Sequence, residues 1–385
     1  MTEEKDHSNP ETKKKLFSSV MDIRNQTPSS PLTTTNSTET LSDNSNNDKS
    51  SSQTFGCRTL DNKDDVFQYN AWDHVDPGSD HERHAQEMIN VQKQTPVPSD
   101  TKEQFNNNPN YYWNKFYENN QNRFFKDRKW LKIEFPELYN WREQNDQSNS
   151  NAGDCDGKFR VLELGCGAGN AIFPLLQDIS DPRLFVHACD FSKTAVDVVK
   201  STIDDIAKQE EDETSGGNIN NCEIGIRERC NAFVWDISSP QLPLEHIEPG
   251  SIDIILLIFV FSALHPDQWK QTIDNLEMLL KPGGMILFRD YGRHDLAQLR
   301  FKKNRYLDEN FYARGDGTRV YFFTSQQIED LFTGKNSSSN TDDVEGVKKF
   351  QVLQNAIDRR LLVNRKQKVK MYRVWLQAKF RKPLC

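Results

Sequence analysis

Short apolar runs rich in branched and aromatic residues recur along the chain and predict β-strands separated by helices. In order they are FRVLEL (159–164), LFVHACD (184–190), CNAFVWDIS (230–238), SIDIILLIFVF (251–261) and KPGGMILFRDYG (281–292), the last entered through a turn. The fourth run is apolar throughout, as expected for a central strand whose sheet is covered on both faces. Residues 350–380 read as a closing antiparallel pair, so the pattern predicts an α/β fold with a mostly parallel sheet.

Polar segments divide the chain into parts. Residues 1–54 contain twenty-six serine, threonine or asparagine residues, too few apolar ones to offset chain entropy, and predict a disordered tail. An N-terminal extension (55–145) and the α/β domain (158–385) are expected to follow. Three further polar patches, at 145–157, 208–221 and 334–343, are interpreted as surface loops because strand-like runs resume after each.

The composition of the chain indicates the cellular compartment in which the protein is expected. The longest apolar run is too short to span a bilayer, and the N-terminus has no signal-peptide core, so no membrane association is expected. Seven cysteines without a C-x-x-C pair, or a histidine at metal spacing, predict reduced thiols and no metal site. We expect a cytoplasmic protein, with the nucleus as the alternative.

Charge is unevenly distributed along the chain. The net charge is −8, yet residues 281–385 carry 22 Lys and Arg against 11 Asp and Glu. The first 280 residues therefore carry 27 basic and 46 acidic residues, a balance of −19. The negative net charge of the whole chain argues against a nucleic-acid partner, whereas the positive charge of its C-terminal third is compatible with one.

A glycine-rich turn joins the first strand to a helix in FRVLELGCGAGNAIFPLL (159–176). Backbone N–H groups and a helix N-terminus meet at such a turn and suit it to ligand binding. Gly165, Gly167 and Gly169 follow G-x-G-x-G, not the G-x-G-x-x-G of dinucleotide sites.

A carboxylate ends each of the next two strands. Asp190 lies twenty-five residues after Gly165, where it can accept both hydroxyls of a ribose. Asp236 is placed to accept an adenine amino group. The order of elements predicts the seven-stranded, Rossmann-like class I fold of S-adenosylmethionine-dependent methyltransferases, with an NAD-binding domain as the alternative.

The stretch YYWNKFYENNQNRFFKDRKWLKIEFPEL (111–138) holds nine aromatic rings interleaved with six basic residues. Together with the motifs above it resembles the tRNA cytidine-32 N3-methyltransferases of the methyltransferase-like 2/6/8 type. The resemblance covers about residues 55–385, and FGCRTL (55–60) and FQYNAWD (67–73) are most similar to the subtype acting on threonine and arginine tRNAs. It is carried by YWNKFY (112–117), FFKDRKWLKIEFPEL (124–138), ELGCGAGN (163–170), LKPGGMILFRDYGRHDLAQLRF (280–301), FYARGDGTRVYFF (311–323) and MYRVWLQAKF (371–380).

The resemblance implies S-adenosyl-L-methionine as the cofactor and an RNA-binding, cofactor-lid role for the extension. The cofactor residues that it implies are Trp113, Tyr117, Gly165, Gly167, Asp190, Asp236, Ile237 and Ile258. Phe124 and Phe125 would flank a flipped pyrimidine, and Lys126, Arg128 and Lys129 would hold phosphates around it. Trp130 and Phe135 are interpreted as core residues.

Exclusion supports N3 as the methylated atom. Methylation of cytosine C5 needs a cysteine nucleophile, yet none occurs between Cys230 and Cys385. The position of the tetrapeptide used by exocyclic-amine methylases reads FVFSALHPD (259–267) instead. Cytosine N3 has a free lone pair at neutral pH, so catalysis reduces to alignment and to balancing the charge of the product.

Asp290 ends the fifth strand and is the predicted charge-balancing residue, with a loop-bracing role as the alternative. The tRNA surface is expected to include Arg293, Arg300, Lys302, Lys303, Arg314, Arg319 and the basic segment 365–373. We expect a monomer acting on tRNA; an auxiliary RNA-binding protein or an aminoacyl-tRNA synthetase is a candidate partner. Methylation of a protein or a small molecule, and a catalytically silent cofactor-binding subunit, are the alternative functions.

Overall fold

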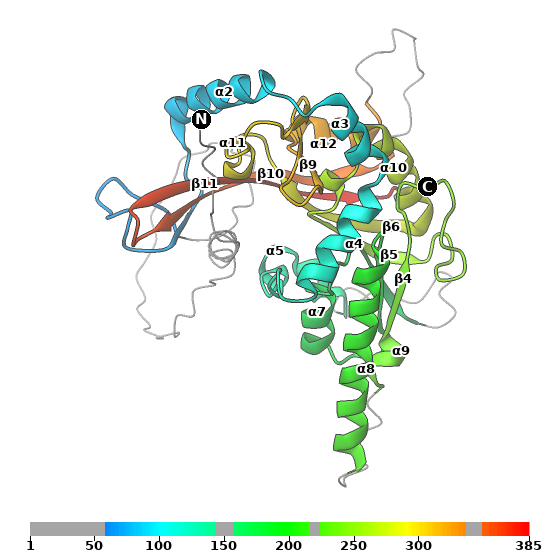
Figure 1. Cartoon of the computed structure of the whole chain (residues 1–385). Helices are drawn as coiled ribbons and strands as arrows, with labels where there is room; N and C mark the ends of the chain where they lie inside the picture. The colour runs from blue at the N-terminus through cyan, green and yellow to red at the C-terminus, as the bar shows by residue number, and fades with distance from the viewer. Residues whose placement is uncertain (1–57, 143–156, 216–223, 336–348, 385) are drawn as a thin grey trace, which may run out of the picture.

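The computed structural model describes residues 58–142, 157–215, 224–335 and 349–384 (Figure 1). The predicted disordered tail (1–54) lies outside these residues. Within the described ranges, no helix is both long and apolar enough to cross a membrane.

The main sheet has eight strands, and seven of them follow the predicted class I arrangement. In spatial order they are β1 (Ala71–Asp73), β10 (Gln351–Asn364), β11 (Val369–Arg381), β6 (Leu280–Tyr291), β5 (Ile252–Ile258), β2 (Phe159–Leu164), β3 (Leu184–Asp190) and β4 (Cys230–Val234). The five strands from β6 to β4 are parallel, and β11 runs antiparallel to both β6 and β10. The predicted closing hairpin is thereby confirmed.

Alternation along the central strands builds a core on each face of this sheet. Ile255 and Leu257 pack into one hydrophobic cluster, whereas Ile254 and Leu256 pack into the other. Successive side chains of a strand point to opposite faces, so a strand covered on both sides must be apolar throughout. The uninterrupted apolar run at β5 therefore correctly indicated the middle of the sheet.

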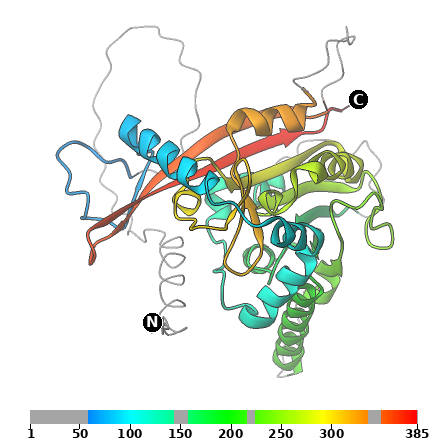
Figure 2. The ribbon, with the colours of Figure 1, turned by 45° about the horizontal axis from the view of Figure 1, so that its top comes forward.

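Helices cover the two faces of the sheet, and α8 extends well beyond it (Figure 1). The helices that follow the glycine-rich turn are α7 (Ile172–Asp178), α8 (Lys193–Ser215), α9 (Ile226–Arg229), η3 (Phe261–Ala263), η4 (Pro266–Gln268), α10 (Trp269–Leu279), α11 (Leu296–Leu299) and α12 (Ser325–Thr333). Figure 2 shows α12 lying along the β10–β11 hairpin. Helices η3, η4 and α10 together connect the end of β5 to the start of β6.

The N-terminal extension supplies the eighth strand and several helices. It comprises β1, α2 (Gly78–Lys93), α3 (Ser99–Asn107), α4 (Pro109–Asn120), α5 (Leu131–Glu134) and η2 (Pro136–Leu138). Arg360 of β10 joins two parts of it, because its guanidinium lies 3.0 Å from Glu134 and 3.5 Å from Asp73. The extension is therefore bound to the hairpin by buried charge as well as by strand pairing.

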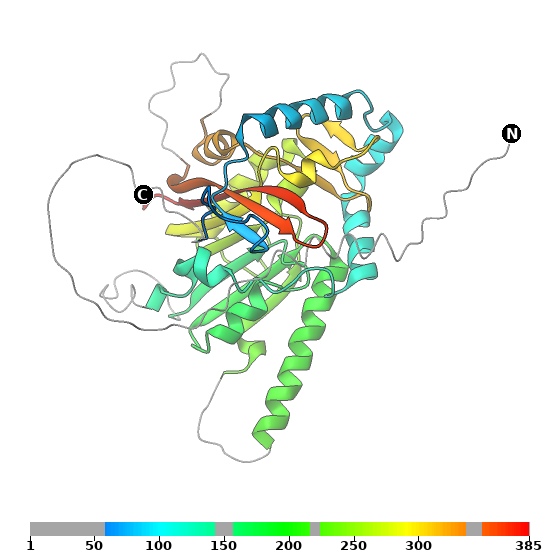
Figure 3. The same ribbon diagram turned by 90° about the vertical axis from the view of Figure 1, so that its left-hand side faces the viewer.

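A second, three-stranded sheet was not predicted. It consists of β7 (Tyr306–Asp308), β8 (Phe311–Ala313) and β9 (Arg319–Tyr321), inserted between β6 and the hairpin. Three-residue strands are too short to show an alternating pattern of apolar and polar residues, so periodicity does not reveal them. Helix α2 crosses above this region (Figure 3), and Gln92 donates to the backbone carbonyl of Gln298 at 3.0 Å.

Candidate active site

A cavity opens at the carboxyl ends of the parallel strands, where doubly wound sheets bind ligands. It is lined by the residues that follow β2, β3, β4 and β5, by helix α4, by residues 124–130, and by the turn between β8 and β9. Every cofactor residue expected from the sequence lines this cavity, as do Phe124, Phe125, Lys126 and Arg128. The fold thus brings together segments that are two hundred residues apart along the chain.

The glycine-rich turn forms the floor of the cavity. Gly165, Gly167 and Gly169 have φ of +60°, +56° and +83°, a region that side chains other than glycine rarely adopt. A Cβ atom added at Gly167 would lie 2.5 Å from the hydroxyl oxygen of Tyr117. Glycine is therefore required there twice, once for the backbone and once for the close approach of the lid.

Asp190 connects this turn to the next strand. Its Oδ2 accepts the backbone N–H of Gly167 at 2.9 Å, and its Oδ1 accepts that of Ser192 at 2.8 Å. Burial raises the pKa of the carboxyl to about 6, although these hydrogen bonds act in the opposite direction. Each carboxylate oxygen retains a further lone pair for a ligand hydroxyl.

Asp236, Ile237 and Ile258 complete the same side of the cavity. Oδ1 of Asp236 accepts the backbone N–H and the hydroxyl of Ser238, at 2.9 and 2.7 Å. Ile237 and Ile258 are buried and present apolar surface beside it. This combination of one acceptor between aliphatic side chains suits the amino edge and faces of a purine.

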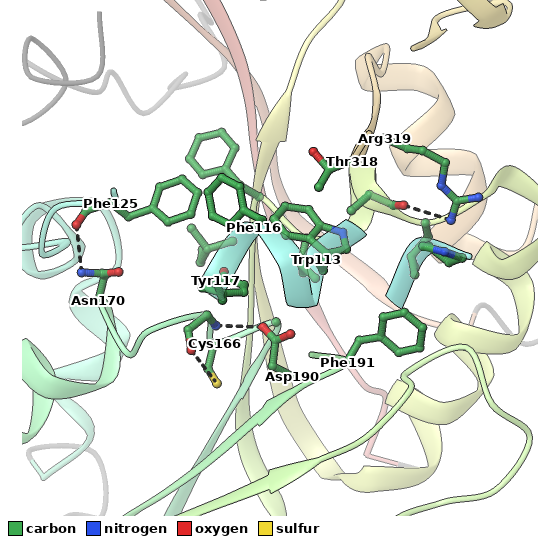
Figure 4. Close-up of a pocket in the computed structure, with 18 of the residues that line it drawn as sticks. Trp113, Phe116, Tyr117, Phe125, Cys166, Asn170, Asp190, Phe191, Thr318 and Arg319 are labelled. Carbon is green, nitrogen blue, oxygen red and sulfur yellow. Dashed lines mark hydrogen bonds between the residues drawn. The ribbon is translucent and has the colours of Figure 1, made fainter. Parts of the chain in front are cut away.

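Helix α4 lies over the cavity and carries two of the predicted lid residues. The rings of Trp113 and Tyr117 are 6.1 Å apart and stacked, on the side opposite Asp190 and Phe191 (Figure 4). Asn110 at the start of the helix donates to the carbonyl of Phe191 at 2.6 Å. Helix α4 is therefore attached to the loop after β3 and faces the carboxylate of Asp190 across the cavity.

The segment after α4 returns across the glycine-rich turn. Phe124 and Phe125 are half-buried, with ring centroids 4.9 Å apart in an edge-to-face arrangement, and both contact Phe116. The side chain of Asn170 donates to the carbonyl of Phe125 at 3.2 Å (Figure 4). The backbone N–H of Arg128 donates to the carbonyl of Asn170 at 2.7 Å. Asn170, which the sequence did not single out, thereby positions the aromatic pair.

The basic residues of this segment occupy different environments. Lys126 and Lys129 are exposed, whereas Arg128 is half-buried, with its guanidinium carbon 5.6 Å from the ring centroid of Phe259. Burial lowers the pKa of Arg128, and the nearby Glu163 acts against that shift. Arg128 and the exposed Lys126 therefore line the cavity, whereas Lys129 does not.

Glu163 is buried beneath Arg128 at the end of β2. Its Oε2 has no hydrogen-bond partner among the described residues. Burial raises its pKa to about 8, with Arg128 lowering it and Asp190 raising it further. Glu163 does not line the cavity, whereas the desolvated guanidinium of Arg128 does and favours an anionic group of a ligand.

Asp290 does not line the cavity. Its Oδ2 accepts the backbone N–H of Ser262 at 2.8 Å, and its Oδ1 accepts that of Tyr291, also at 2.8 Å. The side chain is fully buried, and burial raises its pKa to about 6. These contacts agree with the alternative role of Asp290, which is to hold the loop in place. The neighbouring residue Tyr291 lines the cavity, whereas Asp290 does not.

The turn between β8 and β9 contributes cavity residues that the sequence analysis assigned to a surface or did not consider. Arg314, Asp316, Thr318 and Arg319 all line the cavity. Arg319 is buried and donates to the carbonyl of Ala263 at 3.4 Å, so the expectation that it forms a tRNA surface is wrong. The signal was present in FYARGDGTRVYFF, where two glycines between basic residues indicate a tight turn.

The two aromatic residues interpreted as core differ from each other. Phe135 is completely buried, as expected. Trp130 is half-buried and lines the cavity, with the guanidinium carbon of Arg289 5.1 Å from its ring centroid. Trp130 therefore lines the cavity and is not a core residue.

Comparison with known proteins adds independent information. Residues 162–286 match the family described as a methyltransferase domain. The chain is 45% identical over 353 residues to the tRNA N(3)-methylcytidine methyltransferase trm140 of Schizosaccharomyces pombe, covering 89% of this chain and 100% of that protein. It is 44% identical over 354 residues to the Danio rerio tRNA N(3)-cytidine methyltransferase METTL2, covering 86% and 90%. It is 45% identical over 333 residues to the tRNA(Thr) (cytosine(32)-N(3))-methyltransferase of Saccharomyces cerevisiae, covering 86% of this chain and 46% of that protein.

Proposed function

Because the chain belongs to the family of tRNA N3-methylcytidine methyltransferases, we propose that it methylates N3 of the cytidine at position 32 of tRNA, with threonine and arginine tRNAs as substrates. The methyl donor is S-adenosyl-L-methionine. The observation that carries the proposal is the cavity shared by the glycine-rich turn and by the aromatic and basic segment 124–130.

The residues present fit this cofactor. Asp190 and Asp236 offer acceptors for ribose hydroxyls and an adenine amino group, with Ile237 and Ile258 as apolar neighbours. Arg128, which lines the cavity, offers a cationic partner for the carboxylate of a methionine moiety. The stacked rings of Trp113 and Tyr117 provide the electron-rich faces that favour a sulfonium cation.

When bound, the cofactor supplies an electrophilic methyl group on a sulfur that leaves as a neutral thioether. Cytosine N3 attacks with its in-plane lone pair, so the protein has no proton to remove in this step. The contribution of the chain is to extract the base, to align N3 and to balance the positive charge that the ring gains. We assign the stacking of the extracted base to Phe124 and Phe125, where each base–ring contact is worth about 1–3 kcal/mol.

Charge on the surface supports tRNA as the substrate. Arg365, Lys366 and Lys368 are exposed in the turn of the β10–β11 hairpin, and Lys126 and Lys129 are exposed beside the cavity. Lys368 lies 4.4 Å from the ring centroid of Phe67 and Arg365 donates to the carbonyl of Gln68, so the basic hairpin turn is held against the N-terminal extension. Phosphate contacts of this kind supply most of the sequence-independent affinity for RNA. We propose that the chain acts as a monomer in the cytoplasm.

Methyl transfer to total tRNA, followed by nucleoside analysis, tests the proposal. The expected product is N3-methylcytidine, located at position 32 by primer extension on threonine and arginine tRNAs. Asp190→Ala is the matched inactive control, because its carboxylate is required for the cofactor. Methylation of protein or of a small molecule, with unmodified tRNA, would overturn the proposal. Recovery of activity only after a cell extract is added would assign part of the function to an auxiliary protein.

A further inference from the structure

The positive charge on the methylated base needs a carboxylate that can reach it. Methylation of N3 spreads a cationic charge over the ring and its exocyclic amino group. An acceptor placed at that amino group interacts more strongly with the transition state than with the neutral substrate, and only such a difference accelerates the reaction. Asp290 cannot supply it in this arrangement, because it lies outside the cavity and its oxygens accept the N–H groups of Ser262 and Tyr291.

Asp316 is a carboxylate that does reach the cavity. It lies in the turn between β8 and β9, is exposed, and lines the same cavity as Phe124 and Phe125. Its Oδ1 accepts the backbone N–H of Thr318 at 3.0 Å and its hydroxyl at 2.7 Å. The side chain is therefore held in one orientation by one oxygen, leaving Oδ2 available for a ligand.

The turn that carries Asp316 is rigid and is coupled to the lid helix. The backbone N–H of Arg314 donates to the carbonyl of Thr318 at 2.7 Å, and that of Gly317 donates back to Arg314 at 3.0 Å. Gly317 has φ of +86°, and a Cβ added there would collide with the ring of Tyr112 on α4. The turn is therefore seated directly against the helix that carries Trp113 and Tyr117.

Arg314 adds a donor beside this acceptor. Its Nη1 donates to the carbonyl of Arg319 at 3.0 Å, and its guanidinium carbon lies 5.7 Å from the ring centroid of Tyr291. A guanidinium has five N–H donors, so others remain for a ligand. An acceptor and a donor two residues apart on one turn match the two ends of the Watson–Crick edge of cytosine, on either side of N3.

We propose that the Arg314–Thr318 turn recognises the substrate base, with Asp316 accepting from the exocyclic amino group of cytosine and Arg314 donating to its ring carbonyl. N3 is left free between these contacts. Its lone pair forms the new N–C bond while the electron pair of the breaking S–C bond goes to sulfur, and the resulting charge on the base lies beside Asp316. Uracil presents a carbonyl oxygen in place of the amino group, so the same carboxylate rejects it.

This inference rests on the proposed function, and its test separates the two. Two threonine tRNA transcripts are prepared, one with cytidine and one with 2-pyrimidinone ribonucleoside, which lacks the amino group, at position 32. Single-turnover methyl transfer by the full chain is measured on both, for wild type and for Asp316→Asn. In the variant the amide oxygen keeps the contacts to Thr318, so the amide nitrogen takes the place of Oδ2. Its N–H groups then face the amino group of cytosine, which is also a hydrogen-bond donor.

On cytidine tRNA, Asp316→Asn should lower the rate by about 10²–10³, as loss of one electrostatic stabiliser does elsewhere. On 2-pyrimidinone tRNA the variant and wild type should differ by less than about fivefold, because the partner of Asp316 is absent and the two changes are not additive. Asp308→Asn is the matched control: it neutralises an exposed aspartate of the same small sheet, outside the cavity, and should leave both rates unchanged.

Three outcomes would contradict the inference. Equal losses on the two substrates would show that Asp316 does not contact the amino group. A rate within about threefold of wild type on cytidine tRNA would show that another group balances the charge. Absence of N3-methylcytidine with the wild-type chain would overturn the proposed function itself, and the inference with it.

Discussion

The backbone N–H of Ser262 donates to the carboxylate of Asp290 at 2.8 Å, which joins the end of β6 to the η3 segment after β5. Both oxygens of Asp290 accept hydrogen bonds from backbone N–H groups behind the cavity wall, so its carboxylate stabilises the loop. Asp290 therefore lies at the edge of the sheet where ligands bind, but its carboxylate holds the loop in place and does not face the cavity.

Asp290→Asn should therefore affect stability more than catalysis. The amide offers one acceptor where two donors require two, so the free energy of unfolding should fall by about 1–3 kcal/mol. Denaturant titration measures this change, and single-turnover assays at a temperature where both proteins are folded measure the rate. A rate loss above about tenfold in the folded variant would return the charge-balancing role to Asp290.

Gly167→Ala should weaken binding of S-adenosylmethionine. The residue has φ of +56°, and its new Cβ would lie 2.5 Å from the Tyr117 hydroxyl. Backbone strain alone costs about 1–3 kcal/mol, and displacement of the lid adds to it. Calorimetry should show partial recovery of affinity in the Gly167→Ala, Tyr117→Phe double variant, because the colliding oxygen is removed.

Gly250→Ala provides the control for that experiment. Gly250 has φ of +68° with no atom near its added Cβ, and it lies outside the cavity. The substitution should lower stability by a similar strain and leave cofactor affinity unchanged. Loss of affinity in both variants would assign the effect to general destabilisation.

Affinity for tRNA should depend on salt through the hairpin turn. Neutralising Arg365, Lys366 and Lys368 together should reduce the slope of log affinity against log salt by about 2–3, because fewer counterions are released on binding. Affinity for S-adenosylmethionine should be unaffected. Filter binding at several salt concentrations measures the slope.

The matched control neutralises Lys193, Lys200 and Lys208, which are exposed on α8 away from the hairpin (Figure 1). It removes the same formal charge from a helix that extends in another direction. An equal change of slope in both triple variants would mean that the effect comes from net charge, and an unchanged slope in the hairpin variant would place the RNA surface elsewhere.

Glu163 should make the ligand-free protein less stable as pH rises. Its pKa in the fold is raised from an ordinary value of 4.5 to about 8, so the folded state binds more protons than the unfolded state between these values. Stability that depends on this carboxyl is full below pH 4.5 and is lost progressively up to about pH 8. Denaturation of the wild type and of Glu163→Gln across this range measures the difference.

The difference between the two proteins isolates Glu163, because the other titrating groups are common to both. The wild type should lose stability relative to Glu163→Gln with increasing pH. A difference that stays constant would mean that Arg128 keeps Glu163 ionised throughout, and that the pair is a buried ion pair.

The sequence by itself determined the sheet and the cofactor half of the site. Strand runs such as FRVLEL and LFVHACD coincide with β2 and β3, because burial on both faces demands continuous apolar residues over just the length of a strand. Gly167 and Asp190 were identified for a similar reason. A turn that needs positive φ, and a carboxylate at the end of the adjacent strand, are local requirements written in a few neighbouring residues.

Tertiary structure alone decided which residues of the β8–β9 turn line the cavity. Arg314, Asp316 and Arg319 are charged residues of one short polar stretch, and nothing in the sequence distinguishes their surroundings. In the fold Arg319 is buried in the cavity wall, whereas Asp316 is exposed at the cavity. What separates them is contact with Tyr112, Asn106 and Ala263, residues far away along the chain. Asp290 shows the converse, since its place at the strand end was correctly located and only the backbone donors around it revealed how its charge is used. Burial and hydrogen bonding of a charged group depend on the elements packed around it, and no local pattern encodes these.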